Sequence, residues 1–297
     1  MVNQNQGYSA TRREFLRSTA ATVAGASLTA ALFSPVHAAG TDTLKIALVG
    51  CGNRGTGAIV QALSTKGPVT LWALADTFDD RLQDCLKHVQ REISEKAYDD
   101  GQPATKIDVP KERQFLGLDA YRKAIDACDV VVITGPPGYR PLHFEYAVNA
   151  GKHVFMEKPV ATDPAGVRRI LAAAEEAKKK NLKVGVGLQR RHQRSYLEAI
   201  KRINDGEIGD LVMLRCYWNG GHPAKQPFDR GSLSELEYQV RNWYFFAWLS
   251  GDHICEQHIH NLDVCNWIKN GHPVEAQGMG GRQVRTGKEY GNIFDHH

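Results

Sequence analysis

Residues 44 to 55 read LKIALVGCGNRG, and this stretch decides the fold of the first half of the chain. Leu44 to Gly50 is a mostly apolar run that ends in glycine, which predicts a strand buried on both faces. A G-x-G-x-x-G turn follows, and Thr56 to Leu63 can continue as a helix. This order is typical of a dinucleotide-binding βα unit, in which backbone N–H groups and the helix N-terminus hold a pyrophosphate. A tight turn without a ligand is the alternative. The residues predicted to bind a cofactor here are Gly50, Gly52, Asn53, Arg54 and Gly55.

An acidic residue closes the next predicted strand. Asp76 lies 21 residues after Gly55, where a carboxylate accepts hydrogen bonds from ribose hydroxyls and repels a 2′-phosphate. NAD is therefore preferred over NADP. Thr77 and Arg81 are close enough to accommodate a phosphate, so NADP stays open. Capping of a helix predicted over residues 79–89 is a second use of Asp76.

Strands and helices alternate through the rest of this half. Asp129 to Thr134 predicts another buried strand, Pro141 to Ala150 a helix, and Gly151 to Met156 a further strand. The charged stretch from Arg91 to Arg113 contains glycine and proline and predicts a surface insertion. The alternation predicts an α/β fold with a doubly wound parallel sheet.

The tripeptide Glu157-Lys158-Pro159 follows the last of these strands. Ligands bind at the carboxyl ends of strands in an open α/β sheet, so we expect the Lys158 ammonium to lie beside the cofactor and the substrate. A solvated surface lysine is the alternative.

The first 38 residues predict an export signal. Arg12-Arg13 precedes an alanine-rich apolar stretch from Thr19 to Phe33, and Val36-His37-Ala38 matches a small-residue cleavage pattern. This resembles a twin-arginine signal, which predicts recognition by that export machinery and a periplasmic mature protein. A retained anchor is the alternative, although the stretch is shorter than the ~18 apolar residues expected for a span.

Composition limits the class of protein. The 297 residues suggest about two domains, and 42% hydrophobic with 24% charged residues is typical of a globular protein. Loss of three arginines and one glutamate with the signal lowers the net charge from +4 to +2, which argues against a nucleic-acid surface. The six cysteines show no C-x-x-C pair, so neither a zinc ribbon nor a disulfide framework is indicated, although an individual disulfide stays open.

Taken together, these motifs resemble those of the Gfo/Idh/MocA oxidoreductases, the family of glucose-fructose oxidoreductase and inositol dehydrogenase. The resemblance implies an NAD(P)-binding Rossmann domain over residues 42–165 and a second α/β domain over 166–297, built on a largely antiparallel open sheet. We expect that sheet to be truncated, with an exposed edge or a poorly packed C-terminus. The matching segments are LKIALVGCGNRG (44–55), VVVITGPP (130–137) with His143, GKHVFMEKPVAT (151–162), VGVGL (184–188) with Arg190 and Arg191, and GEIG (206–209).

The resemblance also implies catalytic residues. Ser250 to Trp267 matches a family segment in which an acid and a histidine lie beside the nicotinamide, here Glu256 and His260. Residues i and i+4 share a helix face, so Asp252, Glu256 and His260 are predicted to line one stripe of a single helix. Glu256 replaces the aspartate usual in the family, and His258 stands where a small residue is common, so the substrate and the proton path stay open.

Oxidation of an alcohol suggests a role for each group. His260 fits an acid/base that accepts the hydroxyl proton, and Lys158 can polarise the oxygen or relay its proton. Glu256 can fix the imidazole tautomer or bind a hydroxyl. A structural role for His260 is the alternative. The further cofactor contacts that the motifs predict are Thr134, Pro136, His143, Glu157 and Lys158.

Aromatic and polar residues between Tyr217 and Trp248 suggest a binding site for polyhydroxylated rings, with core packing as the alternative. No metal site is predicted, because His258 and His260 are two apart on a presumed helix and point to different faces. The predicted substrate contacts are Arg191, Trp218, Asn219, Tyr238, Arg241 and Trp243.

We therefore predict an oxidoreductase of a sugar, polyol or related carbohydrate with tightly held NAD(P), because the periplasm offers no ordinary pool of free cofactor. The resemblance also implies a homo-oligomer. A redox-neutral NAD-assisted glycosidase or epimerase is one alternative. A non-catalytic sugar- or nucleotide-binding protein on the same fold is the other.

Overall fold

The structure is a computed structural model that describes residues 43–100, 106–220 and 228–297. Residues Thr43–His297 form one compact unit. The predicted export signal, its cleavage site and the alternative anchor lie outside the described residues. None of the helices described is both long enough and apolar enough to cross a lipid bilayer.

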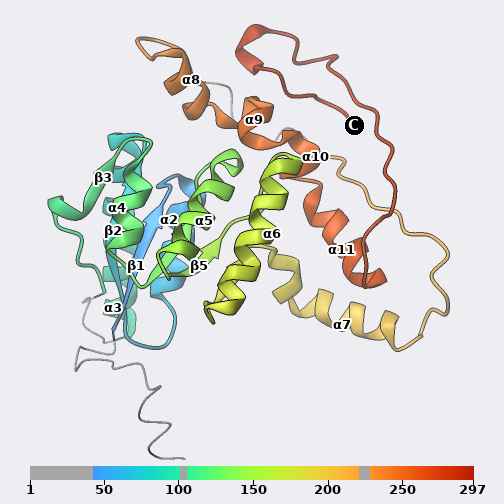
Figure 1. The fold of residues 1–297 in the computed structure, drawn as a ribbon, viewed down its shortest axis with the longest axis horizontal. Helices are drawn as coiled ribbons and strands as arrows, with labels where there is room; N and C mark the ends of the chain where they lie inside the picture. The colour runs from blue at the N-terminus through green and yellow to red at the C-terminus, as the bar shows by residue number, and fades with distance from the viewer. Residues whose placement is uncertain (1–42, 101–105, 221–227) are drawn as a thin grey trace, which may run out of the picture. The chain divides into compact units, whose positions relative to one another are not determined.

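Six parallel strands form the sheet of this unit, in the order β3-β2-β1-β4-β5-β6 (Figure 1). The predicted doubly wound parallel sheet is confirmed. The order reverses between β1 and β4, the switch point at which open α/β sheets bind ligands. The strands are β1 (Leu44–Val49), β2 (Val69–Asp76), β3 (Gln114–Leu116), β4 (Val130–Ile133), β5 (His153–Met156) and β6 (Val184–Val186).

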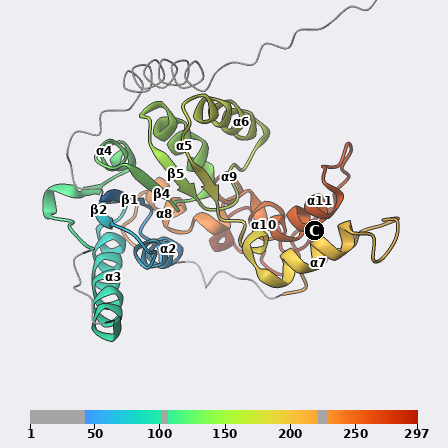
Figure 2. The ribbon, with the colours of Figure 1, turned by 90° about the horizontal axis from the view of Figure 1, so that it is seen from below.

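Helices cover both faces of the sheet (Figure 2). Because successive strand residues point to opposite faces, Ile46 and Leu48 of β1 pack into one core, and Ala47 and Val49 pack into the other. The first core is covered by α2 (Asn53–Leu63) and α3 (Asp79–Asp100), and the second by α4 (Ala120–Asp126), α5 (Arg140–Asn149) and α6 (Pro164–Lys179).

Helix α3 is longer than the sequence predicted. It continues past Val89 to Asp100, so residues 91–100 are helical and do not belong to a surface insertion. The reason is the buried stripe of Leu82, Leu86, Val89 and Ile93, whose spacing keeps one helix face against the core through the charged residues.

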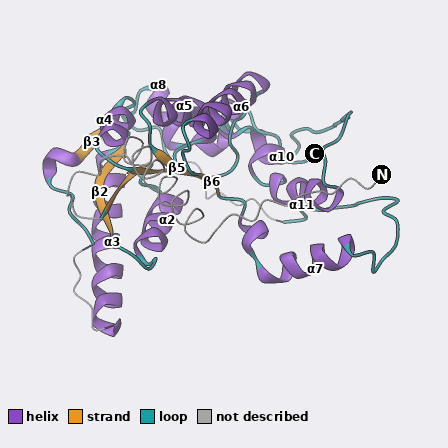
Figure 3. Ribbon diagram, turned by 60° about the horizontal axis from the view of Figure 1, so that its bottom comes forward, coloured by secondary structure: helices purple, strands orange, loops and turns teal. Residues whose placement is uncertain are grey.

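Beyond α6 the chain first returns to the sheet and then becomes helical. Strand β6 pairs with β5, although it lies past the predicted boundary at residue 165. Helices joined by loops follow (Figure 3). They are α7 (Arg194–Asn204), α8 (Glu235–Arg241), α9 (Ala247–Ser250), α10 (Asp252–Glu256) and α11 (Ile259–Lys269), with short 3₁₀ turns at Gln189–His192, Trp243–Phe245 and Lys288–Tyr290.

The antiparallel sheet predicted for residues 166–297 is not formed within the described part of the chain. Residues 211–220 have no regular secondary structure, and Val212 and Met213 are exposed. The described antiparallel pairing is one isolated bridge between Gly281 and His296. A strand needs a neighbour to satisfy its backbone N–H and C=O groups, and this segment has none within the described residues.

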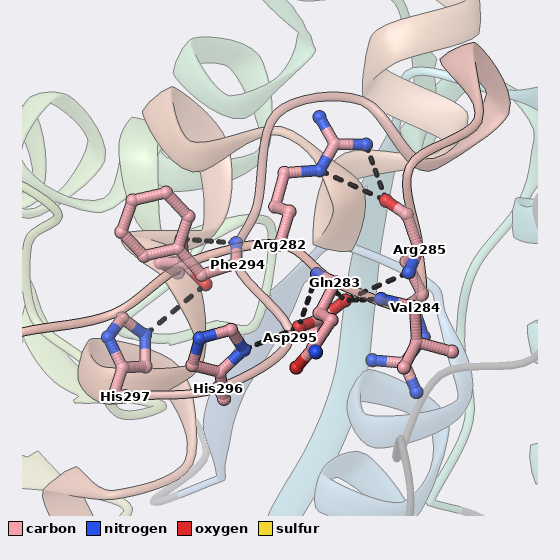
Figure 4. Close-up of polar contacts among 9 residues, drawn as sticks. Arg282, Gln283, Val284, Arg285, Phe294, Asp295, His296 and His297 are labelled. Carbon is pink, nitrogen blue, oxygen red and sulfur yellow. Dashed lines mark hydrogen bonds and ion pairs between the residues drawn. The ribbon is translucent and has the colours of Figure 1, made fainter.

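The last residues are held by a carboxylate. Asp295 accepts hydrogen bonds from the backbone N–H groups of Gln283 (2.9 Å), Val284 (2.7 Å) and Arg285 (2.8 Å), and Figure 4 shows these groups facing it. The three N–H groups lower the pKa of Asp295 well below its usual range. The Arg282 guanidinium closes the same loop by donating to the carbonyl of Arg285. This contact orders the loop locally, while Val274, Met279 and Val284 are exposed, as we expected of a poorly packed C-terminal segment.

Candidate functional site

The glycine turn lies at the switch point and allows no larger residue at two positions. Gly50 has a φ of +97°, and a Cβ there would lie 2.5 Å from the backbone nitrogen of Gly135. A Cβ on Gly55 would lie 2.0 Å from the carbonyl oxygen of Gly50. The Thr134 hydroxyl donates to that same carbonyl at 2.6 Å. The turn therefore brings the N-terminus of α2 against the end of β4.

A cavity of about 740 Å³ opens at this edge of the sheet, within the usual size range of ligand pockets. The turn lines it together with the N-terminus of α2, whose partial positive charge favours a phosphate. The predicted cofactor residues that line this first cavity are Gly50, Gly52, Asn53, Arg54, Gly55, Asp76, Thr134, Pro136 and His143.

Asp76 is held at one end of the first cavity. Its carboxylate accepts hydrogen bonds from the backbone N–H groups of Cys51 (2.6 Å) and Phe78 (2.9 Å). Burial raises the pKa of Asp76, while these hydrogen bonds oppose the rise. Thr77 and Arg81 line the same end, as the predicted NADP alternative requires.

His143 is a neutral part of the wall. Its ring stacks on Tyr121 with centroids 4.1 Å apart. Burial, and then the charge of Arg140, lowers the pKa of His143 to about 3. The imidazole is therefore uncharged at neutral pH and adds a flat surface to the cavity.

A second cavity of about 620 Å³ lies beside the first. Glu157 and Lys158 line it, so every predicted cofactor residue lines one cavity or the other. The residues that line both are Arg54, Thr134, Gly135, Trp243 and Glu256.

Lys158 and Glu256 form an ion pair in this second cavity. The Lys158 ammonium donates to Glu256 Oε1 at 2.7 Å and also to the Glu256 backbone carbonyl. Both side chains are nearly buried, with 12% and 10% of their surface exposed. Burial raises the pKa of Glu256, and Lys158 opposes that rise. An ammonium has three donors, and the described residues account for two of those of Lys158, which leaves the third for an oxygen in the cavity.

Arg140, which the sequence reasoning missed, lines the second cavity together with this pair. It is buried and donates to the backbone carbonyls of Gly135 and Pro159. Burial lowers the pKa of Arg140 to about 10, while Glu157 and Glu256 raise it, so the guanidinium stays charged between two carboxylates. The sequence signal was weak, because an arginine in the first turn of a helix is ordinarily solvated.

Glu256 and His260 do not share one helix, which corrects the prediction of a single stripe. The N–H groups of Gln257 and His258 both donate to the His253 carbonyl, which ends α10, and α11 begins at Ile259. Gly251, with φ of +75°, separates α9 from α10. The i, i+4 spacing alone does not show such a break.

His260 is nevertheless close enough to Lys158 to respond to its charge. Burial, then Lys158 and Arg190, lowers the pKa of His260 to about 4. Its ring stacks on Trp218 with centroids 6.3 Å apart. The Tyr217 carbonyl accepts from Asn261 of α11 at 2.8 Å, which aligns this segment with the helix. His260 is among the described residues but lines neither cavity.

The predicted substrate residues divide into two groups. Arg241 and Trp243 line the first cavity. Arg191 is held away from both cavities by a two-pronged ion pair with Asp263 (2.8 and 2.9 Å). Three others line neither cavity: Trp218 packs on His260, Tyr238 packs edge-on against Phe246, and Asn219 is exposed.

The structure brings His253 and His297 together. The pair of metal ligands considered from the sequence was instead His258 and His260. Ligand-type atoms of Asp252, His253 and His297 lie within 4.8 Å of one another. The rings of His253 and His297 pack edge to face with centroids 3.8 Å apart. Their geometry is that of packed rings.

Sequence comparison decides the family. A family model described as an oxidoreductase family with an NAD-binding Rossmann fold matches residues 44–187, and one described as a GFO/IDH/MocA C-terminal domain matches residues 196–294. The chain belongs to the Gfo/Idh/MocA oxidoreductase family. The predicted family and its NAD-binding fold are thereby confirmed.

Curated relatives of this chain are named inositol 2-dehydrogenases. The chain is 34% identical over 235 residues to the inositol 2-dehydrogenase of Klebsiella pneumoniae (strain 342), covering 77% of this chain and 55% of that protein. The chain thus spans about half the length of the curated relatives it matches.

Solved structures of Gfo/Idh/MocA proteins share the fold. The scyllo-inositol dehydrogenase from Lactobacillus casei with bound NAD(H) and scyllo-inositol has a TM-score of 0.52 at 23% identity, covering 76% of this chain and 56% of that chain. The aldose-aldose oxidoreductase from Caulobacter crescentus complexed with glycerol has a TM-score of 0.54 at 21% identity, covering 85% and 65%. At these identities the likeness concerns the fold alone.

The first cavity fits the cofactor of the Gfo/Idh/MocA fold. The absence of side chains at Gly50 and Gly55 leaves the backbone of the turn open to a pyrophosphate, next to the N-terminus of α2. Asp76 lines the same cavity, and an acidic residue at this place in a dinucleotide-binding fold accepts hydrogen bonds from ribose hydroxyls. When bound, the nicotinamide accepts or donates a hydride.

Proposed function

We propose that this chain carries the site of an NAD(P)-dependent oxidoreductase that acts on a hydroxyl of a sugar, polyol or related carbohydrate, with NAD preferred. The observation that carries the proposal is the Lys158–Glu256 ion pair in a cavity adjoining the one lined by the glycine turn. The inositol dehydrogenases among the relatives support a polyhydroxylated substrate.

Lys158 has the geometry of a polarising group. Two of its donors go to Glu256, which leaves the third to bind the substrate oxygen and to stabilise negative charge as that oxygen loses its proton. Glu256 fixes the ammonium and is itself fixed by Gln257, which donates to its second oxygen. Precise positioning of this kind lowers the cost of orienting the reactants.

His260 is the proposed acid/base. The pKa lowered to about 4 leaves His260 neutral at physiological pH, with a ring nitrogen able to accept a proton, but it also makes His260 a weaker base than an ordinary histidine, whose pKa is closer to the working pH. Trp218 packs against its ring and limits its rotation.

We also propose that the protein acts in the periplasm after twin-arginine export, with its cofactor bound before export, and that the complete protein is a homo-oligomer. These proposals rest on the sequence pattern of residues 11–38 and on the family. The tightly held cofactor follows from them.

The experiment is a cofactor and turnover assay on the full-length protein. We expect denaturation to release NAD(P), and inositols or aldoses to change the absorbance of the bound nicotinamide. Lys158→Ala should lower kcat/KM by about 10²- to 10³-fold, the usual effect of losing one group that stabilises an oxyanion. Lys183→Ala, at an exposed lysine before β6, is the matched control and should leave kcat/KM unchanged.

Other results would redirect the proposal. Bound NAD(P) with product formation but no net absorbance change would support redox-neutral chemistry instead. Sugar binding without any bound cofactor, unaltered in Lys158→Ala, would leave a binding protein.

A further inference from the structure

The end of the first cavity beside Asp76 is walled by two parts of the chain that lie far apart in sequence. On one side are residues that follow β2, namely Thr77, Phe78 and Arg81. On the other side are Phe228 and the C-terminal end of α8. This is the end at which the carboxylate of Asp76 is placed for an adenosine ribose.

Arg241 joins the two sides. Its guanidinium donates to both carboxylate oxygens of Asp80, each at 2.8 Å, across 161 residues of sequence. It also lies over the ring of Phe78, 4.1 Å from the centroid. Only 18% of the Arg241 side chain is exposed. A two-pronged pair that also stacks on an aromatic ring holds one geometry better than a single surface ion pair.

Asn242 fixes Phe228 beside this pair. The Asn242 side chain is buried, accepts from the Phe228 backbone N–H at 2.7 Å and donates to the carbonyls of Phe228 and Tyr238. The guanidinium of Arg81 lies 5.4 Å from the centroid of the Phe228 ring. The ring is therefore held at the cavity wall between Arg81 and Arg241.

We propose that Phe228, Arg241 and Asn242 form a clamp that closes over the adenosine end of a bound NAD(P) and slows its release. The proposal rests on the proposed function in that the first cavity holds the dinucleotide. Flat aromatic and guanidinium faces suit stacking with a purine. Because Arg241 ties α8 to Asp80 in the first turn of α3, departure of the adenosine past this wall requires the pair to open. Arg241 is a positioning residue that keeps the cofactor in place.

The test measures cofactor dissociation and needs no substrate. Full-length protein is loaded with NADH, and the loss of bound NADH fluorescence is followed after addition of excess NAD. We expect Arg241→Ala and Asp80→Asn each to raise the dissociation rate at least about tenfold. The double variant should be no faster than either single variant, because both remove the same pair.

A matched control lies in the same segment. Arg230 forms an exposed ion pair with Glu235 at 2.8 Å, so Arg230→Ala should release NADH at the rate of the unaltered protein. Added salt should speed release from the unaltered protein and have less effect on Arg241→Ala, since an ion pair is screened by salt. Asp80 is a half-exposed surface residue, so Asp80→Asn keeps the test valid if Arg241→Ala does not fold.

The outcomes separate this proposal from the one it rests on. A protein that binds NADH but releases it at the same rate in Asp80→Asn and Arg241→Ala overturns the clamp and leaves the proposed function standing. A protein that binds no NAD(P) in any form overturns both.

Discussion

At the scale of residues, the site combines a cation with a histidine that burial, and then the charge of that cation, keeps neutral. Lys158 lies in a nearly buried ion pair, and its charge helps to lower the pKa of His260. The low pKa keeps the ring neutral at physiological pH but also weakens it as a base, since a general base works best with a pKa near the working pH. In the proposed reaction the charge of Lys158 therefore favours an oxyanion while it disfavours protonation of His260.

This arrangement predicts the titration of His260. In the folded protein its ring should titrate near pH 4, below the usual 6.5, because burial and the charges of Lys158 and Arg190 disfavour the imidazolium. Lys158→Met should move the midpoint upward toward 6.5. NMR of the histidine ring protons measures this midpoint. The signal of His260 is the one that is missing from the spectrum of His260→Asn. A midpoint that stays in place in Lys158→Met would show that Lys158 has no influence on His260.

At the scale of elements, one feature depends on where a helix ends and a second on how a loop is closed. The break between α10 and α11 places Glu256 and His260 on separate helices, although the sequence spacing matched a single one. The loop before residue 297 is closed by the Asp295 carboxylate, in a ring of backbone N–H groups that binds anions in many proteins.

The closed loop predicts a local change in hydrogen exchange. Asp295→Asn removes the charged acceptor, so the amides of Gln283, Val284 and Arg285 should exchange faster, while Asp210→Asn at an exposed position should leave them unchanged. The pKa of Asp295 is lowered on folding. Its contribution is therefore present above the ordinary carboxyl pKa near 3.9 and is lost as the pH falls through the lowered value. Equal exchange in Asp295→Asn and the unaltered protein would contradict the contact.

At the scale of the whole molecule, buried neutral histidines make stability depend on pH. The folded pKa of His143, about 3, lies below its unfolded value near 6.5, so the unfolded chain binds the extra proton between these limits. The free energy of unfolding should fall with decreasing pH in that window, by at most about 1.4 kcal/mol per pH unit for this residue. His260 adds the same effect down to about pH 4.

His143→Phe tests this dependence, because it keeps the flat contact with Tyr121 and removes the titrating group. Urea unfolding at several pH values between 7 and 4 gives the free energy of unfolding at each pH. This free energy should change less steeply with pH in His143→Phe than in the unaltered protein. His272→Asn, at an exposed position, should leave the slope unchanged. A slope that His143→Phe does not alter would mean that the pKa of His143 is the same in the folded and the unfolded protein.

Much of the Rossmann half could be predicted from the sequence. The glycine turn, the parallel sheet and the place of Lys158 follow from short patterns, because apolar runs and glycine positions are fixed by local geometry. The length of α3 was underestimated because charged residues hid its buried face.

Contacts between distant segments could not be predicted. Arg140 and the pairing of Arg241 with Asp80 depend on how the chain brings these residues together, which no local spacing records. The antiparallel sheet came from the family resemblance, and the described residues do not form it, because a strand needs a neighbouring strand to pair with.

The parallel sheet also fixes the distance between the glycine turn and Lys158. β1 leads into the glycine turn and β5 leads into Lys158, and β4 is the one strand between them. Two interstrand steps correspond to roughly 10 Å, whatever the length of the helices that connect them. Insertions in the outer loops can therefore lengthen the chain without changing this span, whereas a shift of β5 against β4 would move Lys158 along the edge. The sheet thus fixes the distance between the glycine turn and Lys158 along this edge.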